Sequence, residues 1–438
     1  MPLLIVFFGI VTLLFLMIKF RLNSFVALII VSIGVGLAEG MPAVEVVNSI
    51  QHGVGSTLGS LTLILGFGAM LGVLIAESGA AQKITSSLIK KFGIKNVQWA
   101  IVFTGFIVGI PMFYSAGFVI LVPIIFTIAS TTGLPLLYVG IPMVASLSVT
   151  HGFLPPHPGP TAISVIFDAD ITLTLIYGIV IAIPTIVLAG PLFSNFLKNI
   201  KVTPPKGLFE TKALKEEELP SLSTSILTAL IPVLLMAISG IFKLILPEDN
   251  PVNMIFGFLG NPVISLLLAV LVAIFTLGIN RGKKVEEVMN QLTESVKSIA
   301  MILLIIGGGG AFKQVLIDSG VGDYIADLMK DSDLSPYILA WGIAGALRIS
   351  LGSATVAGLT AAGIVSPLIA TTGVNPELMV LATGAGSLIL SNVNDAGFWM
   401  FKEYFNLSIA QTFKSWSAME TIVAVMGLVG VLIIDTLI

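Results

Sequence analysis

The chain lacks cysteine, and charged residues make up only 10% of its 438 positions. Without cysteine it can form no disulfide, no thiolate metal site and no thiol nucleophile. Its formal net charge of −3 gives no indication of a nucleic-acid partner. Neither a Walker-type phosphate loop nor an H-E-x-x-H metal motif occurs in it. These absences argue against an enzyme and an ATP-driven pump, and we expect no cofactor and no metal ion.

Apolar residues, in contrast, are abundant. They make up 56% of the chain, and the mean hydropathy is +1.06. They form long runs that alternate with short polar stretches from end to end, and a helix needs about 20 such residues to span a bilayer. Residues 2–18 have no basic n-region and no small-residue cleavage site, so we expect a first span there and not a signal peptide. The sequence predicts an all-α polytopic membrane protein.

Short sequence matches recur in the same order in the two halves of the chain. They are GMPAVEVVNSI (40–50) with GKKVEEVMNQL (282–292), GFGAMLGVLIAESGA (66–80) with GGGGAFKQVLIDSGV (307–321), and ASTTG (129–133) with IATTG (369–373). One short match could arise by chance, but three at nearly constant spacing predict an internal repeat. We expect a first repeat at 1–195, a polar inter-repeat loop at 196–222 and a second repeat at 223–438.

Each predicted repeat contains spanning helices, a re-entrant hairpin and an interrupted helix. The hairpins are expected at 97–131 and 336–372, and the interrupted helices begin near 136 and 377. The expected spans include 57–76, 254–277 and 298–317, and an amphipathic segment is expected at 322–331. If each hairpin enters and leaves on one side, each half crosses the membrane an odd number of times, so the second half is inverted. Inverted repeats with broken helices meeting near the midplane are typical of secondary transporters.

The first interruption, SVTHGFLPPHPGPTA at 148–162, holds four prolines and two of the three histidines of the chain. Its counterpart in the second half is SNVNDAG at 391–397. Proline and glycine release backbone groups from helical hydrogen bonds, and such backbone is tolerated at membrane depth only inside protein or beside a cavity. Helix N-termini at these breaks favour an anion. We therefore expect a binding site for a small polar anion.

The candidate site residues lie at the two hairpin tips and the two helix breaks. They are Tyr114, Ser115, His151, Arg348, Ser353, Thr355, Asn392, Asn394 and Asp395. Arg348 can grip a carboxylate at two points, while Asp395 and Asn394 can hold hydroxyl groups or a proton. Charged groups inside spans are functional candidates by default.

Each candidate also has a structural alternative. Arg348 can simply pair with an acidic neighbour, and His151 and His157 can cap helix ends. Two further features favour structural roles: Lys313 with Asp318 as an ion pair, and the run Gly307–Gly310 as tight helix packing. A metal site of His151, His157 and Asp168 is disfavoured because prolines separate the histidines.

Several of these stretches resemble the gluconate permease family of bacterial proton symporters, over essentially the whole chain. They are GFGAMLG (66–72), SVTHGFLPPHPGPTA (148–162), LLIIGGGGAFKQVL (303–316), RISLGSATVAG (348–358) and NDAGFWMFKEYFNL (394–407). The resemblance implies proton-driven uptake of gluconate or a related sugar acid across the cytoplasmic membrane. It also implies the wider ion-transporter superfamily, in which a scaffold in the lipid bilayer forms a homodimer and a domain with the hairpins moves like an elevator.

The resemblance places the substrate cradle at Tyr114–Gly117, His151–Gly159, Gly352–Thr355 and Asn392–Asp395. Many family members have an acidic residue at the position of Ser115 and a histidine at that of Asn392. Both departures remove a titratable group, which leaves Asp395 and His151 as candidates for proton coupling. The substrate stays open among sugar acids and D-serine, and a sodium-coupled carboxylate carrier is the alternative class.

Overall fold

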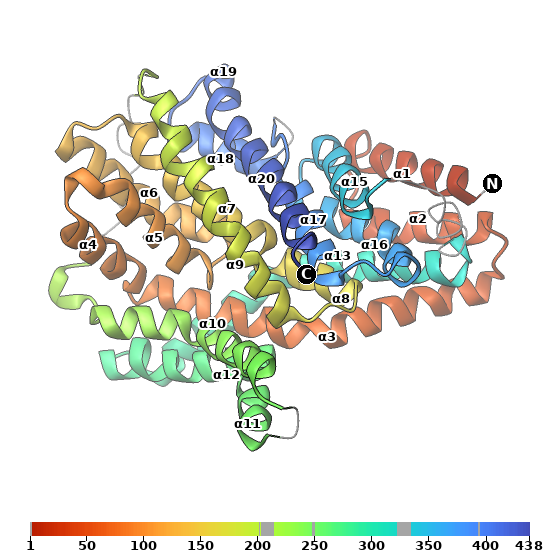
Figure 1. Ribbon diagram of the computed structural model, residues 1–438, viewed down its shortest axis with the longest axis horizontal. Helices are drawn as coiled ribbons and strands as arrows, with labels where there is room; N and C mark the ends of the chain where they lie inside the picture. The colour runs from red at the N-terminus through yellow and green to blue at the C-terminus, as the bar shows by residue number, and fades with distance from the viewer. Residues whose placement is uncertain (1, 201, 203–213, 248–249, 322–333, 393–394) are drawn as a thin grey trace.

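The computed structural model describes the chain except residues 1, 201, 203–213, 248–249, 322–333 and 393–394. The described residues form helices and no strand (Figure 1). Seven of the described helices are long and apolar enough to cross a membrane, or up to nine if each of two bent pairs counts as one span. The predicted all-α polytopic membrane fold is confirmed.

Before the linker the helices are α1 (Pro2–Ile18), α2 (Ser24–Ala38), α3 (Ala43–Glu77), α4 (Ala80–Phe92), α5 (Val97–Gly109), α6 (Tyr114–Thr132), α7 (Leu136–Phe153), α8 (Pro158–Ile166) and α9 (Ile171–Val187). After it they are α10 (Leu222–Ile245), α11 (Pro251–Leu259), α12 (Pro262–Ala273), α13 (Val285–Asp318), α15 (Pro336–Leu351), α16 (Ala354–Thr372), α17 (Pro376–Gly386), α18 (Ala396–Tyr404), α19 (Ile409–Thr412) and α20 (Ala418–Asp435). Single π-helical turns extend α9, α12 and α19, the last at Phe413–Ser417.

The same order of elements occurs in both halves: a long helix, two hairpin helices and an interrupted helix. The long helices α3 and α13 lie along each other, while α4, α5 and α6 gather at one end of the longest axis and α1, α2 and α15 at the other (Figure 1). The inversion of one half relative to the other, and the repeat boundaries, stay predictions. The amphipathic segment expected at 322–331 lies outside the described residues.

Glycines allow α3 and α13 to approach closely. A Cβ atom added at Gly53 would overlap with the Gly310 carbonyl oxygen and lie 2.8 Å from Cβ of Gln314, and one added at Gly310 would overlap with Thr57. The run Gly307–Gly310 therefore packs helices together, as the sequence predicts. Both long helices also begin well before the apolar segments expected at 57–76 and 298–317.

One expected span is broken in the structure. Instead of a single helix over 254–277, α11 ends at Leu259 and α12 begins at Pro262. The Asn261 side chain accepts a hydrogen bond from the amide of Val263, 3.0 Å away, and Pro262 occupies the first helical position. An asparagine cap followed by proline is a strong helix start, so the prediction of a continuous span was wrong.

The described end of the linker, 214–222, is docked and not freely solvated. Leu214 exchanges two hydrogen bonds with the Gln82 side chain, at 2.9 and 3.1 Å, and Glu216 pairs with Lys83. Both partners belong to α4. The linker is thus fastened to the first half of the chain.

Each interruption and each hairpin tip lies between the end of one helix and the start of the next. Helix α7 continues past His151 to Phe153, and α8 begins at Pro158. The counterpart break runs from the end of α17 to the start of α18, and the tips lie between α5 and α6 and between α15 and α16. Helices α15 and α16 pack along each other, whereas α5 and α6 mainly contact α7.

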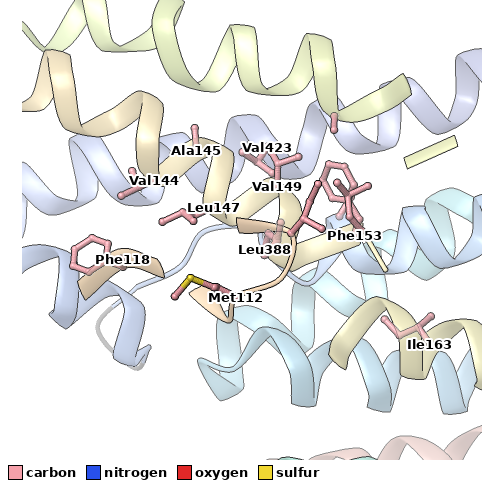
Figure 2. Packing of buried hydrophobic residues seen from close by; sticks show 14 of the residues in the cluster. Met112, Phe118, Val144, Ala145, Leu147, Val149, Phe153, Ile163, Leu388 and Val423 are labelled. Atoms are coloured by element: carbon pink, nitrogen blue, oxygen red, sulfur yellow. The ribbon is translucent and has the colours of Figure 1, made fainter. Parts of the chain in front are cut away.

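Helix α7 is the central element of this part of the molecule, because 16 of its 18 residues are buried. A helix that is apolar on all sides packs inside a helical assembly. Figure 2 shows Leu147, Val149 and Phe153 of α7 in the buried cluster with Leu388, which follows α17, and Val423 of α20. This packing brings the end of α7 next to the second helix break and the start of α20.

Candidate functional site

Arg348 and Asp395 form a buried ion pair between a hairpin tip and a helix break. Arg348 lies in the last turn of α15 with only 4% of its side chain exposed, and Asp395 is the N-cap of α18. The other terminal nitrogen of the guanidinium, Nη1, donates to the carbonyl oxygen of Gly352 at the tip. The pair therefore links the second hairpin directly to the second break.

Asp395 is held on both of its carboxylate oxygens. Oδ1 accepts from the Gly397 amide at 2.9 Å, which is a normal N-cap bond. Oδ2 accepts from Arg348 and from the Ser391 hydroxyl. The negative charge thus faces a guanidinium and the N-terminus of a short helix, both of which stabilise an anion.

The π-helical turn before α20 is hydrogen-bonded to the same helix break. The indole nitrogen of Trp416 donates to Ser391 Oγ at 2.7 Å, and the Ser417 hydroxyl donates to the Ser391 carbonyl oxygen. Trp416 also lies 5.5 Å from the ring of Tyr114, measured between centroids. The sequence analysis missed both Trp416 and Ser417, because nothing in the sequence places this turn beside the break.

Tyr114 and two histidines form the side of the cluster that faces the first half. The ring of His151 lies 6.3 Å from that of Tyr114 and 5.3 Å from that of His157. His157 Nε2 forms a hydrogen bond with the Gly109 carbonyl oxygen, 2.7 Å away, at the end of α5. His157 therefore caps a helix end, as its structural alternative predicts, whereas Nδ1 of His151 is buried without a hydrogen-bond partner among the described residues.

Glu420 completes the cluster from the first turn of α20, and only 1% of its surface is exposed. Ser148 of α7, Arg348 and Asp395 lie close enough to interact with its carboxyl group, yet neither carboxyl oxygen forms a hydrogen bond with any residue that the structure describes. The sequence analysis missed it as well. A lone carboxyl group inside an apolar run is the signal that could have revealed it.

Unmet hydrogen-bonding capacity is concentrated in this cluster. Among the described residues, eight buried side-chain nitrogen and oxygen atoms lack a partner, and five of them belong to Tyr114, His151, Arg348 and Glu420. Native interiors leave few such groups unpaired, so a concentration of them calls for an explanation. The groups include a phenol, an imidazole nitrogen, a guanidinium N–H and a carboxyl group, which together suit a ligand with both a carboxylate and hydroxyls.

Of the other predicted site residues, those within the described part of the chain lie at the same tips and breaks. Ser353 caps α16 by accepting from the Val356 amide at 3.4 Å, and Asn392 donates to the backbone oxygens of Ile349 and Leu390. Thr355 is partly buried in the first turn of α16, Ser115 is exposed, and Asn394 lies outside the described residues.

Lys313 and Asp318 do not form the expected ion pair. Lys313 Nζ donates to the Ile166 carbonyl oxygen at 2.7 Å, and Asp318 accepts from Gln314 at 2.9 Å. Side chains share a helix face at spacings of three or four residues, so two residues five apart on α13 point in different directions. The prediction was wrong for that reason.

Comparison with known proteins places these features in a family. The profile of the GntP family permeases matches residues 1–437. The chain is 57% identical to a high-affinity gluconate transporter of Escherichia coli over the full length of both chains. It is 56% identical to the Gnt-II system L-idonate transporter of the same organism and 51% identical to a gluconate permease of Bacillus subtilis, with 99% of each chain covered.

Solved structures of membrane transporters share the fold at low sequence identity. The YdaH transporter of Alcanivorax borkumensis has a TM-score of 0.67 at 16% identity, covering 94% of this chain and 97% of its own. MtrF of Neisseria gonorrhoeae has a TM-score of 0.61 at 18% identity, covering 89% and 83%. The family profile matches nearly all residues, and the described helices are apolar enough to cross a membrane. The chain therefore belongs to the GntP family of permeases and is a multi-pass protein of the cytoplasmic membrane.

Proposed function

We propose that the protein is a secondary active transporter, not an enzyme, which takes up gluconate or a closely related sugar acid together with protons. Its relatives are named as gluconate and L-idonate transporters. The observation that carries the proposal is the buried cluster around Arg348 and Asp395, where most of the unpaired polar groups gather between a hairpin tip and two helix breaks. Such a cluster suits a polyhydroxylated anion.

The substrate carboxylate binds at Arg348, where it competes with the Asp395 carboxylate. Two carboxylates near one guanidinium repel each other, so binding of the substrate is coupled to the state of the ion pair. The Nε–H of Arg348, which has no hydrogen-bond partner in the described part of the chain, gives the substrate a further donor. Hydroxyl groups of the substrate bind at the remaining polar positions of the tips and breaks: Tyr114, Ser115, His151, Ser353, Thr355, Asn392 and Asn394.

Transport requires the hairpins and helix breaks to move against a fixed part of the molecule. Close glycine packing makes the α3–α13 pair a suitable fixed part. We propose an elevator motion of the hairpin-bearing elements, with the fixed part forming a homodimer in the lipid bilayer. Asp395 and His151 are the coupling candidates that the sequence offers, and the energy comes from an ion gradient because no ATP-binding motif is present.

The test is uptake of labelled gluconate into proteoliposomes containing the purified protein, under an imposed pH gradient or an imposed sodium gradient. L-Idonate, galactonate, glycerate and D-serine serve as unlabelled competitors. Accumulation with the pH gradient alone, blocked by the aldonates, is the expected result. Accumulation with sodium alone would replace the proposal by a sodium-coupled carboxylate carrier, and competition by D-serine alone would change the substrate class.

A further inference from the structure

Glu420 differs from Asp395, the other carboxyl group of the cluster, in the hydrogen bonds that its oxygens form. Among the described residues neither of its oxygens, both buried, forms a hydrogen bond, although the Ser148 hydroxyl lies near them. The other carboxyl group, Asp395, has a guanidinium, a hydroxyl and a helix N-terminus as partners. Burying a carboxylate without a partner is costly, while a protonated carboxyl group carries no charge and can itself donate a hydrogen bond. The site around Glu420 therefore fits a carboxyl group that exchanges a proton.

The position of Glu420 connects it to the substrate-binding groups. The groups that interact with it electrostatically or face it are Tyr114 from α6, Ser148 from α7, Arg348 from α15 and Asp395 at the start of α18. His151 lies on α7 one turn after Ser148 and interacts with the same Arg348 and Asp395. A charge on Glu420 is thus felt wherever the substrate carboxylate binds.

We propose that Glu420, in place of Asp395 or His151, is the proton-binding site that couples the pH gradient to substrate uptake. The inference rests on the proposed transport function and assigns its coupling group. The proton arrives from the more acidic side, binds a carboxyl oxygen of Glu420, crosses with the substrate and leaves on the other side. No covalent bond between heavy atoms forms or breaks.

Charge balance explains why such a proton is needed. The charges of Arg348 and Asp395 cancel, so an ionised Glu420 gives the cluster a net negative charge before the substrate enters. The substrate anion would then add a second negative charge within a few ångströms, in surroundings of low dielectric constant. A proton on Glu420 removes this repulsion, and the substrate therefore binds more tightly at low pH.

The experiment compares wild type with Glu420→Gln, which keeps the shape of the side chain and mimics its protonated form. Gluconate affinity is measured by titration calorimetry from about pH 6 to about pH 8, together with proton uptake on binding in weak buffer. If one proton accompanies each substrate, the wild-type affinity falls by up to about tenfold per pH unit. In Glu420→Gln we expect a pH-independent affinity, no proton uptake on binding, exchange of internal for external gluconate, and no accumulation under a pH gradient.

Matched variants keep the outcome interpretable. Glu39→Gln makes the same substitution at another carboxyl group with a buried oxygen that lacks a partner, on the C-terminal side of α2, and is expected to behave as wild type. Glu420→Asp keeps a carboxyl group and is expected to retain proton-driven accumulation, which also shows that the position tolerates change.

The results separate the two proposals. A Glu420→Gln variant that still accumulates gluconate under a pH gradient, with wild-type pH dependence of binding, overturns the assignment of Glu420 and leaves the transport function standing. If Glu420→Gln does not fold, Glu420→Asp decides the question: proton-driven accumulation with a pH dependence of binding shifted from that of the wild type supports the assignment, and an unshifted pH dependence overturns it. Wild-type protein that does not accumulate gluconate under any pH gradient overturns the proposed function itself.

Discussion

The guanidinium of Arg348 is shared between the Asp395 carboxylate and the Gly352 carbonyl oxygen, so a substrate carboxylate must displace a partner to bind in two-point fashion. Displacement of Asp395 removes the ion pair that links the hairpin to the helix break and leaves the hydrogen bond from Asn392 to the Ile349 carbonyl oxygen between the two elements. In the proposed transport function, substrate binding and the loss of this link are therefore two aspects of the same exchange of partners.

Asp395→Asn tests this competition. Asparagine is as good an N-cap as aspartate, so the start of α18 is kept while the negative charge is lost. We expect gluconate binding to be retained or strengthened. Net uptake is expected to fall by roughly tenfold or more, because residue 395 no longer supplies a carboxylate that neutralises Arg348 when the carrier is empty. Calorimetry and proteoliposome uptake measure the two quantities. Weakened binding together with normal uptake would contradict the competition.

Removal of Arg348 tests the energetics of the pair. Arg348→Ala leaves Asp395 charged and buried without its partner, which is expected to destabilise the protein by about 3–5 kcal/mol. The double variant with Asp395→Ala removes both charges and should recover part of the lost thermal stability in detergent, while gluconate binding stays absent. A double variant less stable than Arg348→Ala would mean that Asp395 contributes mainly as a cap.

The sequence allowed prediction of Arg348 and Asp395 because charges within apolar segments are rare and both lie at predicted breaks. The sequence marks Glu420 as a lone carboxyl group in an apolar run, but it does not place this group in the cluster, which forms only when α20 packs against α7 and α15. The same limit applies to Trp416, whose hydrogen bond to Ser391 joins residues 25 positions apart. Contacts between distant elements depend on tertiary packing, which local sequence patterns do not encode.

At the scale of the element, proline and glycine made the interruptions predictable because they act on the backbone locally. The full lengths of α3 and α13 were not predictable from hydropathy. Polar residues such as Gln51 and His52 lower the hydropathy of the first part of α3 without ending the helix, because they are compatible with helical backbone and lie exposed.

The contact between α3 and α13 gives a prediction with a control in the same helix. Gly53→Ala places a methyl group against the Gly310 backbone and is expected to lower the free energy of unfolding by about 1–3 kcal/mol. Gly55→Ala lies two residues away with nothing within 4 Å of its added Cβ, and alanine favours a helix over glycine by about 1 kcal/mol. Thermal unfolding of both variants in detergent is the measurement, and equal effects would rule out tight packing at Gly53.

At the scale of the whole molecule, the element order recurs in the two halves, yet the corresponding hairpins differ. Helices α15 and α16 pack together, while α5 and α6 are splayed over α7. This difference was not predictable from the repeat, because similar sequences fold into similar elements without fixing how each pair packs in one state of a transport cycle. The inverted orientation of the halves, the boundaries at 195 and 223 and the homodimer stay predictions.

Trp416 can report on the state of the Arg348–Asp395 ion pair through its intrinsic fluorescence. Its indole donates to Ser391, which in turn binds Asp395, so an exchange of partners at Arg348 alters the polarity around one of only four tryptophans in the chain. We expect gluconate to change the intrinsic fluorescence of the protein, with the change lost in Trp416→Phe and kept in Trp99→Phe, whose indole is 40% exposed. A change that survives Trp416→Phe would place the responding tryptophan elsewhere. If the change depends on Trp416, stopped-flow fluorescence can measure the rate at which the ion pair opens in unlabelled protein.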